Sequence, residues 1–258
     1  MAQTIAALTN KPAWVDLSTS DAASARDFYS RLFGWKLDVS ADPQYGGYAT
    51  AKLGDRSVGG IAPKREDDKT PTAWSMYIGT DNADELAKKV QAAGGTVVAP
   101  PFDVGDQGRM AVFQDPSGAF ISAWQPGQMS QFVLGIPNAY GWAELNARGL
   151  DRAIAFYEAA LGWTHSTSPF GEGQEYTQFA IGGENIAGAL EMNPMVPAEV
   201  PSYWMVYFMA DDVDAAYQKA LDLGAREMVS PQDFPGGRFA IVSDPQGASF
   251  GLLSMPRR

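Results

Sequence analysis

The chain of 258 residues contains no cysteine and a single histidine. The absence of cysteine excludes disulfide bonds and thiolate metal sites, and it is typical of a reducing compartment. Lys and Arg number 19 against 30 Asp and Glu, which gives a formal net charge of −11. Because phosphate binding needs clustered basic side chains, neither nucleic acid nor an anionic lipid surface is an expected partner.

Long apolar segments are also missing from the sequence. No segment approaches the roughly 20 consecutive apolar residues that a membrane-spanning helix needs, so no membrane association is expected. Residues 1–12 lack a basic start followed by an apolar run, which predicts no signal peptide and a cytoplasmic location. Hydrophobic residues make up 45% of the chain, and its length suits two ordinary domains with their own cores.

An internal repeat spans nearly the whole chain. Residues 14–17 (Trp-Val-Asp-Leu) match residues 142–145 (Trp-Ala-Glu-Leu), and later Gly108-Arg109 matches Gly237-Arg238. The turn at residues 115–119 likewise matches residues 244–248. The repeat predicts domains at residues 10–126 and 138–256, joined by a linker at 127–137 that contains Gly and Pro.

Each copy is predicted to hold two modules with the element order βαβββ. Asp21 is placed to cap a helix at residues 21–32 and Gly34 to end it. The prediction is an α+β fold, a tandem duplication in which helices cover the convex face of a cupped mixed sheet. The other helices are expected at 82–93, 151–160 and 212–223, and strands of the first copy at 14–19, 47–53, 57–62, 74–80, 96–99, 110–114 and 120–124.

These motifs resemble the vicinal oxygen chelate superfamily, a group that includes glyoxalase I, bleomycin-resistance and fosfomycin-resistance proteins and extradiol dioxygenases. The resemblance rests on the paired modules, on the late Asp-Pro-x-Gly turn and on Phe28-Tyr29 and Gly34-Trp35 with their second copies. It covers nearly the whole chain. It is closer to tandem-domain actinobacterial members that are called glyoxalase-like or hydroxylases on homology alone. Such a resemblance implies a glyoxalase-like fold without fixing the reaction.

The family's usual chemistry needs a divalent metal held by His and Glu side chains on three strands. At the matching positions the first copy has Trp14, Ser75 and Ser122. The second copy has Trp142, Met205 and Gly251 there. None of these supplies an imidazole or a carboxylate, so no metal and no other cofactor is predicted. This argues against glyoxalase I and extradiol dioxygenase activity, which both use the metal.

Strand alternation, combined with the inward ligand positions that the resemblance implies, predicts an aromatic cup with one carboxylate in each copy. The carboxylates Asp16 and Glu144 are the candidate catalytic residues, as general base or acid. Their alternative role is an ion pair with Arg109 or Arg238, which could instead bind an anionic ligand group. The candidate ligand-binding residues are Trp14, Tyr48, Tyr77, Arg109, Ser122 and Trp124 in the first copy, and Trp142, Tyr176, Gln178, Met205, Tyr207 and Arg238 in the second.

Other aromatic and titratable residues are expected to be structural. Trp74 and Trp204 have the opposite strand parity and should pack under helices, and His165 should lie at the surface. The second copy has the fuller set of acid–base candidates, so one functional and one degenerate pocket is a plausible arrangement. The chain is expected to be a monomer with paired domains or a homodimer.

Three functions are compatible with the sequence. The first is a metal-independent small-molecule-binding protein whose ligand is an aromatic or apolar metabolite or antibiotic, in antibiotic biosynthesis or resistance. The second is a metal-free cyclase, isomerase, lyase or hydrolase of secondary metabolism that uses a pocket carboxylate. The third is a glyoxalase-like or dioxygenase-like metalloenzyme with non-standard ligands.

Overall fold

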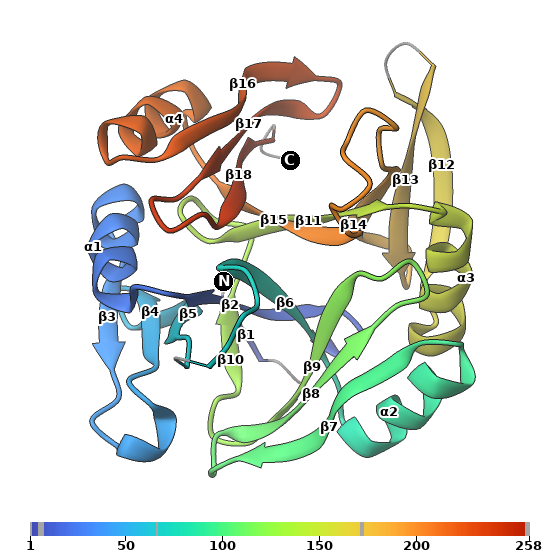
Figure 1. Cartoon of the computed structure of the whole chain (residues 1–258), viewed down its shortest axis with the longest axis horizontal. Coiled ribbons are helices and arrows are strands. Elements are labelled where there is room, and N and C mark those ends of the chain that lie inside the picture. The colour runs from blue at the N-terminus through green and yellow to red at the C-terminus, as the bar shows by residue number, and fades with distance from the viewer. Residues whose placement is uncertain (1, 5–7, 66, 171–172, 256–258) are drawn as a thin grey trace.

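The computed structural model describes residues 2–4, 8–65, 67–170 and 173–255. These residues form two similar α+β domains, each with a curled eight-stranded mixed sheet (Figure 1). The predicted fold class is therefore confirmed. Residues 1 and 5–7 of the segment considered as a signal peptide, and residue 256 at the predicted end of the second domain, lie outside the described residues.

Domain 1 contains the two predicted modules. Its sheet has the strand order β3-β4-β5-β2-β6-β9-β8-β7, so the first strands of the two modules, β2 and β6, lie side by side at its centre. A short 3-10 turn, η2 (Pro43–Tyr45), precedes β4. The elements are β2 (Pro12–Thr19), α1 (Ala22–Phe33), β3 (Lys36–Val39), β4 (Ala49–Leu53), β5 (Arg56–Pro63), β6 (Ala73–Gly79), α2 (Ala83–Ala92), β7 (Thr96–Val104), β8 (Gly108–Gln114) and β9 (Phe120–Pro126).

Domain 2 repeats this architecture with the strand order β12-β13-β14-β11-β15-β18-β17-β16. Its elements are β11 (Tyr140–Ala147), α3 (Leu150–Leu161), β12 (Thr164–Phe170), β13 (Gln174–Ile181), β14 (Glu184–Glu191), β15 (Tyr203–Met209), α4 (Val213–Asp222), β16 (Arg226–Phe234), β17 (Gly237–Ser243) and β18 (Ser249–Ser254).

The helix boundaries follow from local capping. The Asp21 carboxylate accepts a hydrogen bond from the Ser24 backbone N–H at 3.0 Å, and Gly34 ends α1 in the left-handed region with φ of 72°. Asp212 caps α4 in the same way. Among the described residues, no helix is both long and apolar enough to cross a membrane.

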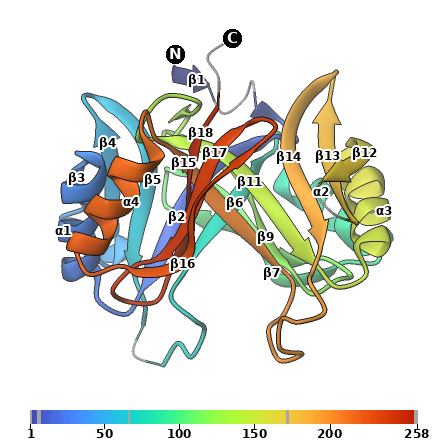
Figure 2. The same cartoon turned by 90° about the horizontal axis from the view of Figure 1, so that it is seen from above.

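The two domains pack through their helices and convex sheet faces. Figures 1 and 2 show α1 beside α4 on one flank and α2 beside α3 on the other. The Tyr29 hydroxyl donates to the Asp244 carboxylate at 3.0 Å, across the domain boundary. The Trp74 indole N–H donates to the same Tyr29 oxygen at 2.9 Å, which places Trp74 in the buried interface as its parity predicts.

A second contact repeats this arrangement with the domains exchanged, so that the tyrosine and tryptophan belong to domain 2 and the aspartate to domain 1. The Tyr157 hydroxyl donates to Asp115 at 2.9 Å, and the Trp204 indole N–H donates to Tyr157 at 2.8 Å. We call these two sets of three residues the interdomain clamps. Because each clamp joins a helix of one domain to the Asp-Pro-x-Gly turn of the other, the motif shared by the two copies holds the two domains together.

The predicted linker contains a strand that the sequence did not indicate. β10 (Gln131–Val133) lies within residues 127–137 and pairs antiparallel with β1 (Ala2–Thr4). Three residues are too few to show a hydrophobic period, which is why this strand was not predicted. Phe132 and Val133 are nonetheless fully buried, so the linker contributes to the core.

Candidate functional site

The candidate site of domain 1 lies on the concave face of its sheet, opposite the helices. Along β2, Val15 and Leu17 are fully buried toward the helices, so Trp14 and Asp16 lie on the other face. Cross-strand pairing places Tyr77 of β6 beside Trp14, and Ser122 of β9 beside Tyr77. The three strands that carry the family's ligand positions therefore meet here, as the alternation predicts.

Two tyrosines hold the Asp16 carboxylate. The Tyr77 hydroxyl donates to Asp16 Oδ2 at 3.1 Å, and the Tyr48 hydroxyl also hydrogen-bonds to this carboxylate. The Trp14 indole N–H in turn donates to the Tyr48 oxygen at 3.0 Å. Burial raises the pKa of Asp16 to about 7, although the two phenol hydrogen bonds oppose the shift. The position can therefore change its charge near neutral pH.

Domain 2 has the same arrangement around Glu144. The Tyr207 hydroxyl donates to Glu144 Oε1 at 3.2 Å, Tyr176 also hydrogen-bonds to this carboxylate, and Asn146 lies within 3.5 Å of Oε1. The Trp142 indole N–H donates to Tyr176 at 2.9 Å. Burial raises the pKa of Glu144, and burial together with the nearby carboxylate raises the pKa of both tyrosines. The phenols therefore remain protonated donors at neutral pH.

Two glycines that sequence reasoning missed make room for these tyrosines. A side chain at Gly60 would overlap the Tyr48 hydroxyl, and a side chain at Gly188 would overlap that of Tyr176. Both glycines are paired in register with the carboxylate residue on the neighbouring strand. The recurrence of Gly60 and Gly188 at matching places in the two copies is the sequence signal that could have identified them.

Gln178 and Met205, the other candidates in domain 2, also share this face. Gln178 pairs in register with Gly188, and Gly188 pairs with Glu144, so the three lie in one row across neighbouring strands. Met205 pairs with Glu144 from the other side and is buried beside Tyr207. The structure therefore brings together all the candidates of domain 2 except Arg238.

The predictions for Arg109 and Arg238 are wrong in their placement. Arg109 forms ion pairs with Asp84 at the start of α2 and with Asp103 on β7. Arg238 does the same with Asp214 and Asp233. Both arginines lie on the helix-covered side of the sheet, so they neither pair with Asp16 or Glu144 nor reach a ligand on the concave face.

His165 is at the surface, as predicted. Its Nδ1 lies 2.7 Å from Glu158 Oε1, and both side chains are exposed.

The linker covers the part of the concave face of domain 1 that holds Trp14 and Trp124. The Phe132 ring of β10 packs on the Trp14 ring with centroids 5.5 Å apart. The Trp124 indole N–H donates to the Met129 carbonyl of the linker at 3.1 Å. In Figure 1, β10 lies beside β5, and the two strands are in contact. As a result, Trp14 is only 1% exposed and is part of the main hydrophobic core.

The concave face of domain 2 has a different environment. Met205, Tyr207 and Leu253 form a separate buried cluster that does not merge with the main core. We call the cluster and its partly exposed neighbours the domain 2 wall. The partly exposed members are Trp142, Tyr203, Met209, Phe234, Phe239 and Ile241. Half-exposed aromatic rings around a carboxylate are typical of a ligand-binding surface.

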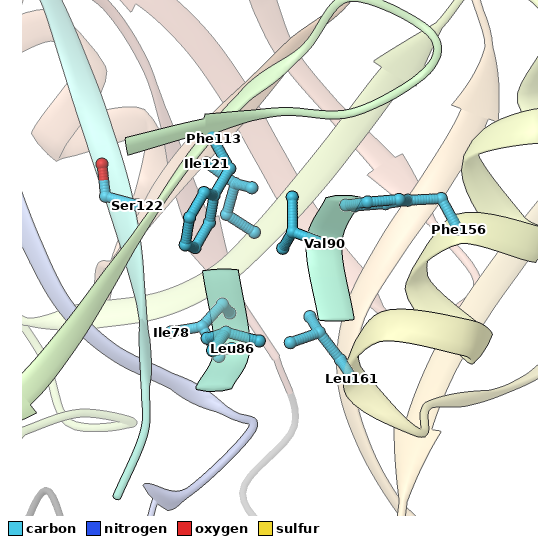
Figure 3. Close-up of a pocket in the computed structure, with 8 residues that line it drawn as sticks. All are labelled: Ile78, Leu86, Val90, Phe113, Ile121, Ser122, Phe156 and Leu161. Atoms are coloured by element: carbon cyan, nitrogen blue, oxygen red, sulfur yellow. The ribbon is translucent and has the colours of Figure 1, made fainter. Parts of the chain in front are cut away.

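Two hollows lie away from the Glu144 carboxylate. The one in Figure 3 lies between α2, the sheet of domain 1 and Phe156 and Leu161 of α3, and its volume is about 10 Å³. This is room for about one water molecule among apolar side chains, so we interpret it as imperfect packing between the domains. A hollow of about 230 Å³ lies beside the domain 2 wall, where Met209 and Ser254 meet Gly135 and Pro137 of the linker.

The residues at the family's metal-ligand positions do not fit a divalent metal. In domain 1 they are an indole and two hydroxyls, and in domain 2 an indole, a thioether and a glycine without a side chain. Divalent ions of this family's chemistry need imidazole or carboxylate donors. Across the part of the chain that the structure describes, no group of three His, Asp or Glu side chains has the spacing of a metal site.

Comparison with known proteins agrees with this architecture. A family model described as the Glyoxalase/Bleomycin resistance protein/Dioxygenase superfamily matches residues 11–122 and 139–252. CFP32 of Mycobacterium tuberculosis (strain CDC 1551 / Oshkosh) is 40% identical over 247 residues, which cover 94% of each chain. The anthracycline biosynthesis protein DnrV of Streptomyces peucetius is 37% identical over 258 residues, covering 95% of this chain and 93% of DnrV.

Solved structures share the fold at low sequence identity. The Mn(II)-bound glyoxalase from Novosphingobium aromaticivorans superposes with a TM-score of 0.66 at 16% identity, covering 98% of this chain and 83% of that one. The 2,3-dioxygenase LapB from Pseudomonas sp. KL28 gives a TM-score of 0.65 at 15% identity, covering 97% and 95%. With both halves of the chain matched by the family model, the chain belongs to the Glyoxalase/Bleomycin resistance protein/Dioxygenase superfamily.

Proposed function

We propose that the chain binds a planar aromatic metabolite on the concave face of domain 2, without a metal ion. The observation that carries the proposal is the domain 2 wall, an apolar cluster that is separate from the core and whose aromatic rings remain half-exposed. Partly exposed aromatic rings gain buried contact area when a flat ligand stacks on them. Glu144 at the base of the wall supplies one polar group that can orient the ligand.

The covering of domain 1 supports a single site per chain. The Phe132 ring already packs against Trp14, the counterpart of Trp142. A ligand in domain 1 would have to displace a fully buried aromatic side chain, whereas a ligand in domain 2 would not. We therefore assign ligand binding to domain 2 and a structural role to the covered face of domain 1.

The relatives favour an aromatic ligand of secondary metabolism. DnrV, which matches along nearly its full length, is named for anthracycline biosynthesis, and anthracyclines contain fused planar rings. The wall of aromatic side chains in domain 2 is complementary to a ligand of this shape. The proposed ligand is accordingly a polycyclic aromatic intermediate or product of antibiotic biosynthesis.

A titration with a neutral probe tests this proposal. We expect 2-(hydroxymethyl)anthraquinone to bind the purified chain, and Phe239→Ala in the domain 2 wall to weaken binding by about tenfold, since an aromatic contact contributes roughly 0.5–1.5 kcal/mol beyond its buried area. The matched control is Met110→Ala, the corresponding position of domain 1, which should leave the affinity unchanged. Equal losses in the two variants, or no binding by the unmodified chain, would contradict the proposal.

A metal-free enzyme is the second candidate function. The observation that favours it is a half-buried carboxylate with raised pKa beside two phenols, an arrangement that can accept or donate a proton. Glu144 would then be the general base or acid of a cyclase, isomerase, lyase or hydrolase reaction. Mass spectrometry of the recovered ligand distinguishes the two functions. Return of an unchanged ligand supports binding, and conversion that Glu144→Gln abolishes in a folded protein supports catalysis.

A further inference from the structure

Among the residues that the structure describes, no Lys, Arg or His forms an ion pair with Glu144. Its contacts within the described residues are the hydroxyls of Tyr176 and Tyr207 and the amide of Asn146, all uncharged. A carboxylate that is half-buried without a counter-charge favours a cationic partner.

The rings around Glu144 favour the same kind of partner. Trp142 and Tyr203 are partly exposed on this face, and burial together with the nearby Glu144 carboxylate raises the pKa of the Tyr203 phenol. The face of an aromatic ring carries negative electrostatic potential and attracts ammonium groups, most strongly where water is excluded. A carboxylate bordered by such rings is therefore complementary to a protonated amine, and it would repel a ligand carboxylate.

We propose that Glu144 binds a protonated amine on the ligand, so that the ligand combines a planar aromatic body with a basic nitrogen. The inference rests on the proposed binding function of domain 2. Tyr176 and Tyr207 have a positioning role, because their hydroxyls fix the carboxylate and leave its remaining acceptor capacity free for the ammonium. Domain 1 offers the matched comparison, since Asp16 has the same two-tyrosine support, but the neighbouring Trp14 is covered by Phe132 of the linker.

Three probes of nearly equal size and different charge test the inference. They are 2-(aminomethyl)anthraquinone, which carries an ammonium group, the neutral 2-(hydroxymethyl)anthraquinone, and anthraquinone-2-carboxylate. We expect the ammonium probe to bind about 10- to 100-fold more tightly than the alcohol, as for a hydrogen bond to a charged group, and the carboxylate to bind most weakly. Titration of the intact chain at neutral pH measures all three affinities.

Two variants, each lacking one carboxylate charge, show which domain causes the preference for the ammonium probe. Glu144→Gln should abolish the preference for the ammonium probe over the alcohol, and Asp16→Asn should leave that preference intact. Equal affinity of the ammonium and alcohol probes, or a preference that survives Glu144→Gln, would overturn the inference and leave the aromatic site standing. Failure of all three probes to bind would instead overturn the proposed function on which the inference rests.

Discussion

At the scale of single residues, the carboxylate on the first strand is the feature that the two copies share most closely. Asp16 and Glu144 differ by one methylene group, yet each accepts hydrogen bonds from two tyrosines. In each copy a glycine on the neighbouring strand makes room for one of those tyrosines. A glycine that leaves space for a tyrosine, two phenol donors and a half-buried carboxylic acid therefore form one unit, and each domain contains one such unit.

The pH dependence of stability should reveal the buried acid of domain 1. The folded-state pKa of Asp16 is about 7, above the value near 4 expected for an unfolded chain. Between these values the folded state binds more protons, so the contribution of neutral Asp16 is complete below about pH 4 and is lost as pH rises to 7. Asp16→Asn removes this titration. The free energy of unfolding of the variant, relative to the unmodified chain, should therefore rise from pH 4 to 7.

Urea unfolding of both proteins at several pH values measures this difference. A difference that stays constant across the window would show that Asp16 is ionised in the folded protein.

Much of the site could be predicted from the sequence, because strand parity assigns faces once the family resemblance indicates which positions point inward. Trp14, Asp16 and Tyr77 were placed together on this basis, and the structure has them in contact. Arg109 was proposed from its recurrence in the second copy instead. Its neighbour Met110 pairs with Trp124 on the concave face, so parity puts Arg109 on the opposite face. Recurrence alone cannot separate a ligand-binding arginine from one that pairs with a helix.

At the scale of secondary structure elements, the interdomain clamps explain why Phe-Tyr and Asp-Pro-x-Gly recur. The hydroxyl of each tyrosine donates to an aspartate of the other domain and accepts from a tryptophan of its own. All of these groups are buried, so the loss of one hydroxyl leaves two polar groups without their partner.

Tyr29→Phe and Tyr157→Phe should therefore each destabilise the chain. We expect a loss of about 1–3 kcal/mol in the free energy of unfolding for each buried polar group left unpaired. Tyr45→Phe is the matched control, because its hydroxyl bonds Asp106 in an exposed loop, and it should change stability little. Chemical denaturation of the three variants provides the measurement. A change no larger than that of the control would argue that water replaces the clamp hydroxyls.

The elements that sequence reasoning missed have weak patterns. β3 and β12 are edge strands whose residues are almost all exposed, so they show no alternation between apolar and polar side chains. The helices were predicted within a residue or two, because Asp21, Asn82 and Asp212 cap three of them and their apolar faces repeat regularly. Tertiary packing, and no local signal, determines the position of β10 in the linker.

At the scale of the whole molecule, the two domains share one core. The Phe33 ring of domain 1 lies 5.1 Å from that of Phe208 in domain 2, and Tyr29 lies 5.5 Å from Phe250. The main hydrophobic cluster continues across the boundary in this way. An interface of this kind couples the domains far more strongly than a polar linker contact would.

We therefore expect the chain to unfold in a single cooperative transition. Separating the domains would expose buried aromatic rings and both interdomain clamps, so a state with one folded domain should be poorly populated. Differential scanning calorimetry should give equal calorimetric and van't Hoff enthalpies. Two resolved transitions, or a van't Hoff enthalpy near half the calorimetric value, would show that each domain folds independently.

The duplication has thus produced two domains with the same unit of carboxylate and tyrosines and different surroundings. In domain 1 the linker covers Trp14 beside the unit, whereas the counterpart Trp142 in domain 2 is partly exposed. Our central claim is that this difference assigns ligand binding to domain 2.

A crystal structure of the chain with 2-(hydroxymethyl)anthraquinone tests this claim most directly. It should show the ring system stacked among Trp142, Tyr203 and Phe239, beside Glu144, with Phe132 still packed on Trp14. A ring system bound on the concave face of domain 1, with Phe132 displaced, would contradict the claim.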